Sequence, residues 1–444
     1  MLEQHIYGPD GYFDIKDSYK LSSRLSFERV KNGMIYVDNA FLNENFITFY
    51  SHLHQYGFVL DENNKYVLSA ANHRSPVGGR SENAETVFSH MPARVHKKAI
   101  YLGCIIRHWG HFLVEGISRW WFMLNDEQYQ DYELCYTVSG QQRDYMNQIM
   151  DLFGLDKSRL RKIEVNTIYD ELIIPEVSTE FKQFWTEEYK QTVRRITQNI
   201  KPVYNEKIYL SRTKFGDRLL GEKVIEKTFK HNGYKIIYPE RLSVKKQIAI
   251  IKGARKIACV SGTTAHNLIF AGDGSECAVL ERSITPNRAQ FVINDMNKLK
   301  ISYIKASYSF LPTGDGYGPF LIGITPYLEQ YFKENKITYN PQETDSYKQF
   351  EQTYLRLWHA CYNNVEGFET ILFDNPQATM SGLEQIRQKL DDNLKTVKLQ
   401  IKTDKKIKEI AAVKPSRLRL FYKEKRGRER TFYFCGIPVY HYKK

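Results

Sequence analysis

The central part of the chain alternates short, continuously apolar runs with segments in which apolar residues recur every three or four positions. Runs of the first kind predict buried strands, and segments of the second kind predict helices. The strands are expected at 97–106, 133–138 and 171–175, and the helices at 107–124 and 142–155. Residues 1–95 predict short strands and turns, with a hairpin at 57–68 and a glycine-rich loop at 71–85.

A second and more regular series begins near Lys207. It predicts four strands, at 207–212, 234–239, 256–260 and 277–282. Helices are predicted between them, at 221–233, 243–254 and, after a turn, within 261–271. Such an alternation is the signature of a parallel, doubly wound sheet. The sequence therefore predicts the α/β fold class, with two layered units.

The pattern changes after residue 340. Residues 340–376 are aromatic and predicted to be helical. In 381–412 the apolar residues are spaced 3, 4, 4, 3 and 4 apart, which predicts an amphipathic helix with a narrow stripe. That stripe can dock on the body or pair with a second copy of the chain. The resulting division of the chain is 1–200, 201–340, 341–412 and 413–444.

The net charge of +13 is concentrated at one end of the chain. Residues 395–444 hold 16 Lys or Arg and 4 Asp or Glu, so the body before them is nearly neutral. A neutral body gives little support to nucleic-acid binding. The basic residues of 413–444 are interleaved with aromatic ones, which predicts docking on an anionic membrane surface. A strand packed on the body, with a solvated charged face, is the alternative.

The 6 cysteines form no C-x-x-C pair, which argues against a zinc site and a disulfide framework. The first residues contain no apolar leader, and no run approaches the ~18 apolar residues of a membrane-spanning helix. We therefore expect a cytoplasmic protein that its basic tail holds on the inner face of the plasma membrane.

The first candidate for chemistry is the segment 261–267, which follows a predicted strand and opens a predicted helix. Gly262 lets a ligand approach the backbone, Thr263 and Thr264 add hydroxyl groups, and a helix start binds phosphate. The segment is neither a Walker A loop nor G-x-G-x-x-G, which argues against an NTPase or a dehydrogenase. The N-cap of a structural helix is the alternative.

Two further candidates lie where predicted strands end, which is where ligands of open α/β sheets bind. Ser211 and Arg212, followed by Lys214, end one strand, and an arginine there can hold a diphosphate. Glu281 ends another strand, and its carboxylate can accept hydrogen bonds from ribose hydroxyls. A solvated charge or a helix cap is the alternative at each position.

Polar groups also share one face of the apolar helix predicted at 107–124. His111, Glu115 and Arg119 follow one another at intervals of 4 residues. Because buried polar groups are costly, we interpret Glu115 as a general base that His111 positions and Arg119 supports. A structural Glu–Arg ion pair is the alternative. A metal site that includes His108 is weaker, because the H-E-x-x-H spacing is absent.

No D-x-D triplet occurs in the chain. Many nucleotide-sugar enzymes hold Mg²⁺ or Mn²⁺ with such carboxylates. Its absence favours a metal-free site in which Arg, Lys and a helix N-terminus neutralise the diphosphate.

In order and spacing, four segments within residues 98–285 resemble glycosyltransferase family 61, in its bacterial capsule and surface-polysaccharide branch. These segments are His111 to Glu115 with Arg119, Ile208 to Arg212, Gly262 to Asn267, and Val279 to Glu281. Two positions depart from the family pattern. Glu115 stands where the family often has Asp, and Ser261-Gly262 replaces its usual His-Gly, with His266 later.

The resemblance implies two Rossmann-like halves facing a cleft, the arrangement called GT-B. It implies an inverting, metal-independent transfer from a UDP-sugar or similar donor to a glycan or lipid-linked glycan acceptor, in capsule or envelope polysaccharide synthesis. Catalysis falls to Glu115 and His111. The donor site falls to Ser211, Arg212, Lys214, Gly262, Thr263, Thr264, His266, Asn267 and Glu281. A non-catalytic sugar-nucleotide-binding scaffold is the alternative, against which the intact set of Glu115, Arg212 and Glu281 argues.

Overall fold

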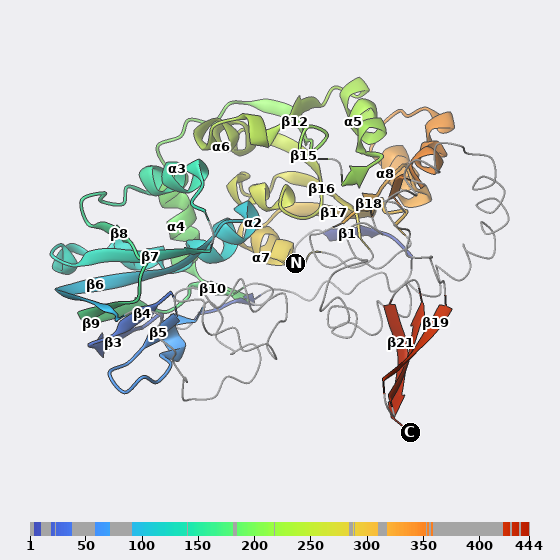
Figure 1. Cartoon of the computed structure of the whole chain (residues 1–444). Helices are drawn as coiled ribbons and strands as arrows, with labels where there is room; N and C mark the ends of the chain where they lie inside the picture. The colour runs from blue at the N-terminus through green and yellow to red at the C-terminus, as the bar shows by residue number, and fades with distance from the viewer. Residues whose placement is uncertain are drawn as a thin grey trace.

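The computed structural model contains two large β-sheets with helices packed against them, and a small antiparallel sheet at the C-terminal end (Figure 1). The mixed α/β class predicted from the sequence is confirmed, and both large sheets contain parallel strands. The residues that the structure describes are 4–9, 19–22, 24–37, 58–71, 91–139, 141–180, 184–216, 218–283, 287, 289–309, 318–351, 353–354, 357, 421–426, 429–434 and 437–443. The helix predicted at 381–412 and most of the loop predicted at 71–85 lie outside them.

The first sheet is mixed. Its strands are β3 (Phe27–Lys31), β4 (Met34–Tyr36), β5 (Phe58–Leu60), β6 (Ala93–Ile106), β7 (Glu133–Ser139), β8 (Leu160–Lys162) and β9 (Thr167–Pro175). They lie in the order β5-β4-β9-β6-β7-β8, with β3 also paired to β9. β9, β6, β7 and β8 run parallel, whereas β3 and β4 pair with β9 in the antiparallel sense. The antiparallel strands distinguish this sheet from the wholly parallel sheet of a Rossmann unit.

The second sheet is parallel throughout its described pairings. Its strands are, in spatial order, β1 (Gln4–Tyr7), β17 (Lys300–Lys305), β16 (Glu276–Glu281), β15 (Ala254–Val260), β12 (Asn205–Leu210) and β14 (Lys235–Ile237). The predicted strand and helix alternation is confirmed by α5 (Glu222–His231) and α6 (Val244–Lys252), which connect β12, β14 and β15. β1 comes from the start of the chain, so this sheet takes one strand from the region that the sequence assigned to the first unit.

We call the first sheet with its helices the first half of the molecule, and the second sheet with its helices the second half. One continuous apolar core runs through both halves. Trp120 and Phe153 belong to it from the first half, and Ile248 and Phe270 from the second. The helices α3 (Asp144–Phe153) and α4 (Glu187–Thr197) of the first half pack on α6 and on the segment Ala265–Phe270. Burial of this shared surface holds the two sheets in one fixed arrangement.

The segment predicted as one helix at 107–124 is broken into three. It consists of α2 (Trp109–His111), a π-helical turn at Phe112–Gly116 and a 3-10 helix at Trp120–Leu124. A π turn holds more residues per turn than an α-helix, so the 4-residue stripe read from the sequence does not persist. The expectation that one face carries His111, Glu115 and Arg119 is therefore wrong for Arg119.

The C-terminal residues form an antiparallel meander of β19 (Phe421–Arg426), β20 (Glu429–Phe434) and β21 (Ile437–Lys443). Its strands pair with one another and with no other described sheet. Within 340–376 the structure describes the 3-10 segments Pro341–Glu343 and Ser346–Phe350. Among the helices of the described residues, none has the length and apolar character needed to span a bilayer.

Candidate active site

The turn after β15 is the centre of the candidate site. Gly262 has a φ of +95°, and a Cβ there would lie 2.8 Å from Cζ of Arg282. Only glycine combines this backbone conformation with so close an approach. The residues that follow, Ala265–Phe270, form a 3-10 helix and not the predicted α-helix. The side chain of Asn297 donates to the carbonyls of Leu268 and Ile269 (3.1 and 2.9 Å), near the end of this segment.

The 3-10 conformation of Ala265–Phe270 changes how the turn can bind an anion. A 6-residue 3-10 segment has no extended set of aligned peptide dipoles, so the phosphate-binding helix N-terminus expected from the sequence is absent here. Thr263 is half-buried and Thr264 is buried. Charge at this turn therefore comes from neighbouring side chains.

Arg212 supplies one of these charges. It follows β12, and its Nη1 donates to Oγ1 of Thr264 (3.4 Å). Its backbone N–H donates to Oε1 of Glu222 (2.9 Å), which also accepts from Tyr209 (3.1 Å). Burial raises the pKa of Glu222 to about 7, against the effect of these hydrogen bonds, and burial lowers the pKa of Arg212.

Ser211 and Lys214 lie beside Arg212 but do not reach the turn. The Ser211 hydroxyl is buried and donates to Oε2 of Glu226 (2.5 Å), which also accepts from Thr213 (2.6 Å). Lys214 is exposed on the loop. The structure therefore uses Ser211 to hold the connection from β12 to α5.

Glu281 and Arg282 end β16, next to the turn. Glu281 is 1% exposed, and burial raises its pKa to about 8, although Ser261 and Arg282 lower it. It is thus protonated near neutral pH and differs from the ionised, accessible carboxylate that the sequence suggested. Arg282 is also buried, with its guanidinium 4.1 Å from the ring centroid of Phe320. Sequence reasoning missed Arg282, although its place directly after a strand end was a signal.

The side chains of His111 and Glu115 form a hydrogen-bonded pair in the first half of the molecule. Nδ1 of His111 contacts Oε2 of Glu115, and the two side chains are 27% and 3% exposed. Arg119 lies apart from this pair. Its guanidinium donates to the carbonyl oxygens of Pro175 and Ala71, so it supports the backbone of the first sheet.

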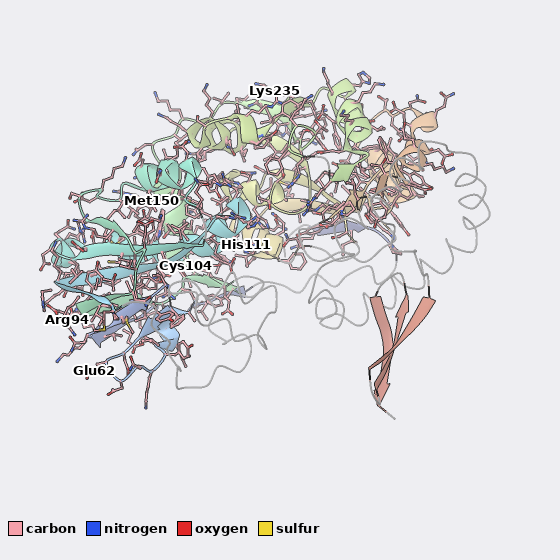
Figure 2. All side chains as sticks on the ribbon, in the orientation of Figure 1. Glu62, Arg94, Cys104, His111, Met150 and Lys235 are labelled. Carbon is pink, nitrogen blue, oxygen red and sulfur yellow. The ribbon has the colours of Figure 1, made fainter. Side chains whose placement is uncertain are left out.

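The two halves meet at Gly110 and His266. A Cβ at Gly110 would lie 3.0 Å from Cε1 of the His266 ring and closer still to Nδ1. Beside this contact, Nε1 of Trp109 donates to Oδ1 of Asn267 (2.9 Å). Figure 2 shows His111 at the junction of the two halves. The structure thus brings the predicted catalytic pair to the predicted donor turn, although these segments are more than 140 residues apart.

His266 is held neutral at this junction. It is 4% exposed, and its pKa is lowered to about 3 by burial, then by the positive charges of His111 and Arg282. Glu115 and Asn287 have the opposite, smaller effect. A neutral imidazole can exchange hydrogen bonds with an uncharged group but supplies no cation for phosphate.

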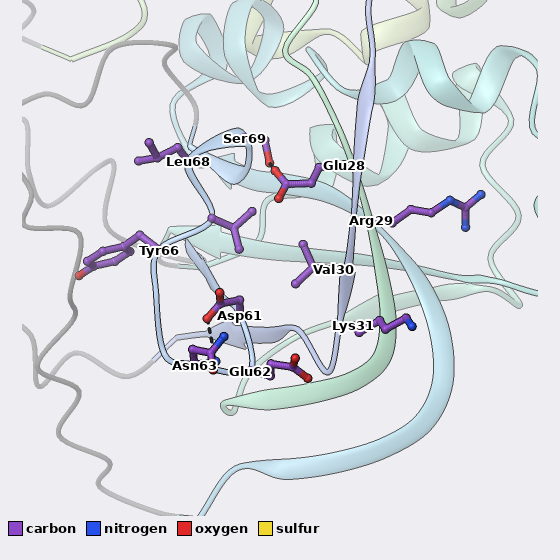
Figure 3. A pocket seen from close by; sticks show the side chains of 11 residues that line it. Glu28, Arg29, Val30, Lys31, Asp61, Glu62, Asn63, Tyr66, Leu68 and Ser69 are labelled. Atoms are coloured by element: carbon purple, nitrogen blue, oxygen red, sulfur yellow. Dashed lines mark hydrogen bonds between the residues drawn. The ribbon is translucent and has the colours of Figure 1, made fainter.

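Two cavities of the described residues lie away from this site. One of 460 Å³ is on the first sheet beside β3, where Glu28 and Asp61 line it and Glu28 accepts a hydrogen bond from Ser69 (2.6 Å) (Figure 3). The other, of 420 Å³, is at the amino ends of β15, β16 and β17, opposite to Arg212 and Glu281. Among the described residues, no three His, Cys, Asp or Glu side chains are grouped as metal ligands.

Replacement of Gly110 by alanine tests the junction. The added methyl group must displace His266 or separate the halves, so we expect Gly110→Ala to lower the free energy of unfolding by about 1–3 kcal/mol. Gly272→Ala is the matched control, because its Cβ would meet no atom closer than 3.6 Å. Urea unfolding measures both variants, and equal stability of the two would contradict the close contact.

The pKa of His266 predicts a pH dependence of stability. The folded-state value of about 3 lies below the ordinary 6.5, so the unfolded chain binds more protons between these values. The stabilisation from neutral His266 is complete above pH 6.5 and is lost as the pH falls toward 3. Below 6.5 the wild type should lose about 1.4 kcal/mol per pH unit relative to His266→Gln. Urea unfolding of both chains between about pH 7 and 5 measures this, and parallel curves would refute it.

Residues 109–279 match the family described as Glycosyltransferase 61. The match begins at α2, includes the His111–Glu115 pair, Arg212 and the turn at Gly262, and ends within β16. No curated protein matches the chain. The match supports the resemblance to glycosyltransferase family 61 and, with it, glycosyltransferase activity in general.

Proposed function

We propose that the protein transfers a sugar from a UDP-sugar to a hydroxyl group of a glycan acceptor, without a metal ion and with inversion at the anomeric carbon. The observation that carries this proposal is the junction at which Gly110 and His266 bring the His111–Glu115 pair against the turn at Gly262. The resemblance to family 61 supports the reaction class. In this proposal the two halves form a GT-B arrangement, and the product enters a capsule or envelope polysaccharide.

The different exposure of the two members of the pair supports a proposal for their roles. His111 is the more exposed member, so an acceptor hydroxyl meets the imidazole before it meets Glu115. When Nδ1–H donates to Glu115, Nε2 carries the lone pair that accepts a proton. We therefore exchange the roles expected from the sequence. His111 is the general base, and Glu115 fixes the tautomer and stabilises the imidazolium.

The reaction then follows as one displacement. The acceptor oxygen gives its proton to Nε2 of His111 and forms a bond to the anomeric carbon. The bond from that carbon to the donor phosphate breaks, and its electron pair leaves with UDP. Arg212, beside the turn at Gly262, holds the diphosphate, because a guanidinium binds phosphate oxygens through charge-assisted hydrogen bonds.

Variants of the pair test this assignment. We expect His111→Gln to lower the rate of sugar transfer, measured as UDP release from a UDP-sugar that the wild type uses, by about 10²–10⁴-fold. Donor affinity should change only a few-fold. In Glu115→Gln the acid limb of the pH–rate profile should move to lower pH, because the carboxylate no longer favours the imidazolium. Glu127→Gln, an exposed change in the neighbouring 3-10 segment, is the control. Near-normal turnover of His111→Gln, with Glu115→Gln inactive, would return the base role to Glu115.

We also propose that residues 413–444 dock the protein on anionic membrane. Residues 414–444 contain 10 Lys or Arg and 2 Glu. The meander register pairs Phe432 with Lys423 on one strand and with Tyr440 on the other, so basic and aromatic positions are adjacent. The full chain should float with vesicles that contain anionic lipid, at low salt, and a chain ending at Val413 should not. Failure of the full chain to float would refute membrane docking.

A further inference from the structure

Arg282 lies at the edge of the turn at 262–264, in contact with Gly262 and Phe320. It follows β16 directly, and 7% of its surface is exposed. Its Cζ lies 4.1 Å from the ring centroid of Phe320. Gly262 is also in contact with the guanidinium, because a Cβ at Gly262 would lie 2.8 Å from Cζ. A cation held in this way loses little conformational freedom when it binds an anion.

Arg212 reaches the same turn from the opposite side. β15, which carries the turn, lies between β12 and β16 in the sheet. Arg212 follows β12 and donates to Thr264 (3.4 Å), whereas Arg282 follows β16 and lies against Gly262. Two guanidinium groups, one from each strand beside β15, therefore flank residues 262–264.

Arg282 lies against Gly262, four residues before the His266 ring that contacts the first half. The positive charge of Arg282 is one of those that lower the pKa of His266. His266 also contacts Gly110, in the same short helix as His111. Arg282 thus lies beside the segment that connects the turn to the junction with the first half.

We propose that Arg282 and Arg212 clamp the donor diphosphate across the turn at 262–264, with Arg282 on the phosphate that carries the sugar and Arg212 on the phosphate next to the nucleoside. This inference rests on the proposed function. As the bond to the anomeric carbon breaks, its electron pair remains on an oxygen of the sugar-bearing phosphate. Arg282 stabilises that added charge in a site shielded from water.

Calorimetry with UDP and UMP tests the assignment, because UMP lacks the second phosphate. Arg282→Gln should bind UDP about 10–100-fold more weakly than the wild type and bind UMP within about 3-fold. Arg212→Gln should weaken both ligands. Arg255→Gln is the matched control, because Arg255 is exposed near the start of β15, at the opposite end of the sheet. Arg282→Lys keeps a cation over Phe320 and should retain part of the preference for UDP.

The outcomes separate this inference from the proposed function. If Arg282→Gln binds UDP as tightly as the wild type does, or loses UDP and UMP affinity in equal ratio, the assignment of Arg282 is wrong. If Arg282→Gln fails to fold, Arg282→Lys replaces it in the test. Equal losses of UDP affinity and UMP affinity in Arg282→Lys would overturn the assignment. If the wild type itself binds neither UDP nor another nucleoside diphosphate, the proposed donor is wrong.

Discussion

Gly110 lies against the imidazole of His266, and the relation between the two halves of the molecule depends on this contact. It leaves no room for a side chain at position 110, so this contact requires a glycine there. Trp109 adds a hydrogen bond to Asn267, and Tyr189 on α4 donates to the carbonyl of Leu113 (2.8 Å) in the π turn. Because the apolar core behind these contacts is continuous, the proposed catalytic pair and the proposed donor turn are packed together in the structure without a ligand.

Burial determines the charge of the site as much as residue type does. Glu281 is kept protonated near neutral pH, and His266 is kept uncharged, because both are removed from water. Arg212 and Arg282 keep their charge, since burial does not deprotonate a guanidinium at neutral pH. At the turn the two arginines are charged, whereas Glu281 and His266 are neutral, so these four groups together favour an anion. The proposed diphosphate site requires this property.

The sequence was most informative where the hydrophobic pattern was regular. The parallel series from β12 to β16 was predicted because each strand is a continuous buried run and α5 and α6 separate the strands clearly. Prediction failed where tertiary contacts override periodicity. The π turn at Phe112–Gly116 accepts a hydrogen bond from Tyr189, and the 3-10 segment Ala265–Phe270 accepts one from Asn297, so both have partners distant in sequence. The same holds for Gly110, whose importance comes from a ring 156 positions later.

If one composite site is assembled where the two halves meet, a crystal structure of the protein with UDP will show it. We expect the diphosphate within hydrogen-bond distance of Arg282 and Arg212 beside the turn at Gly262, with His111 facing the sugar-bearing phosphate. UDP bound away from this turn, for example in the cavity beside Glu28 or at the amino ends of the second sheet, would contradict it.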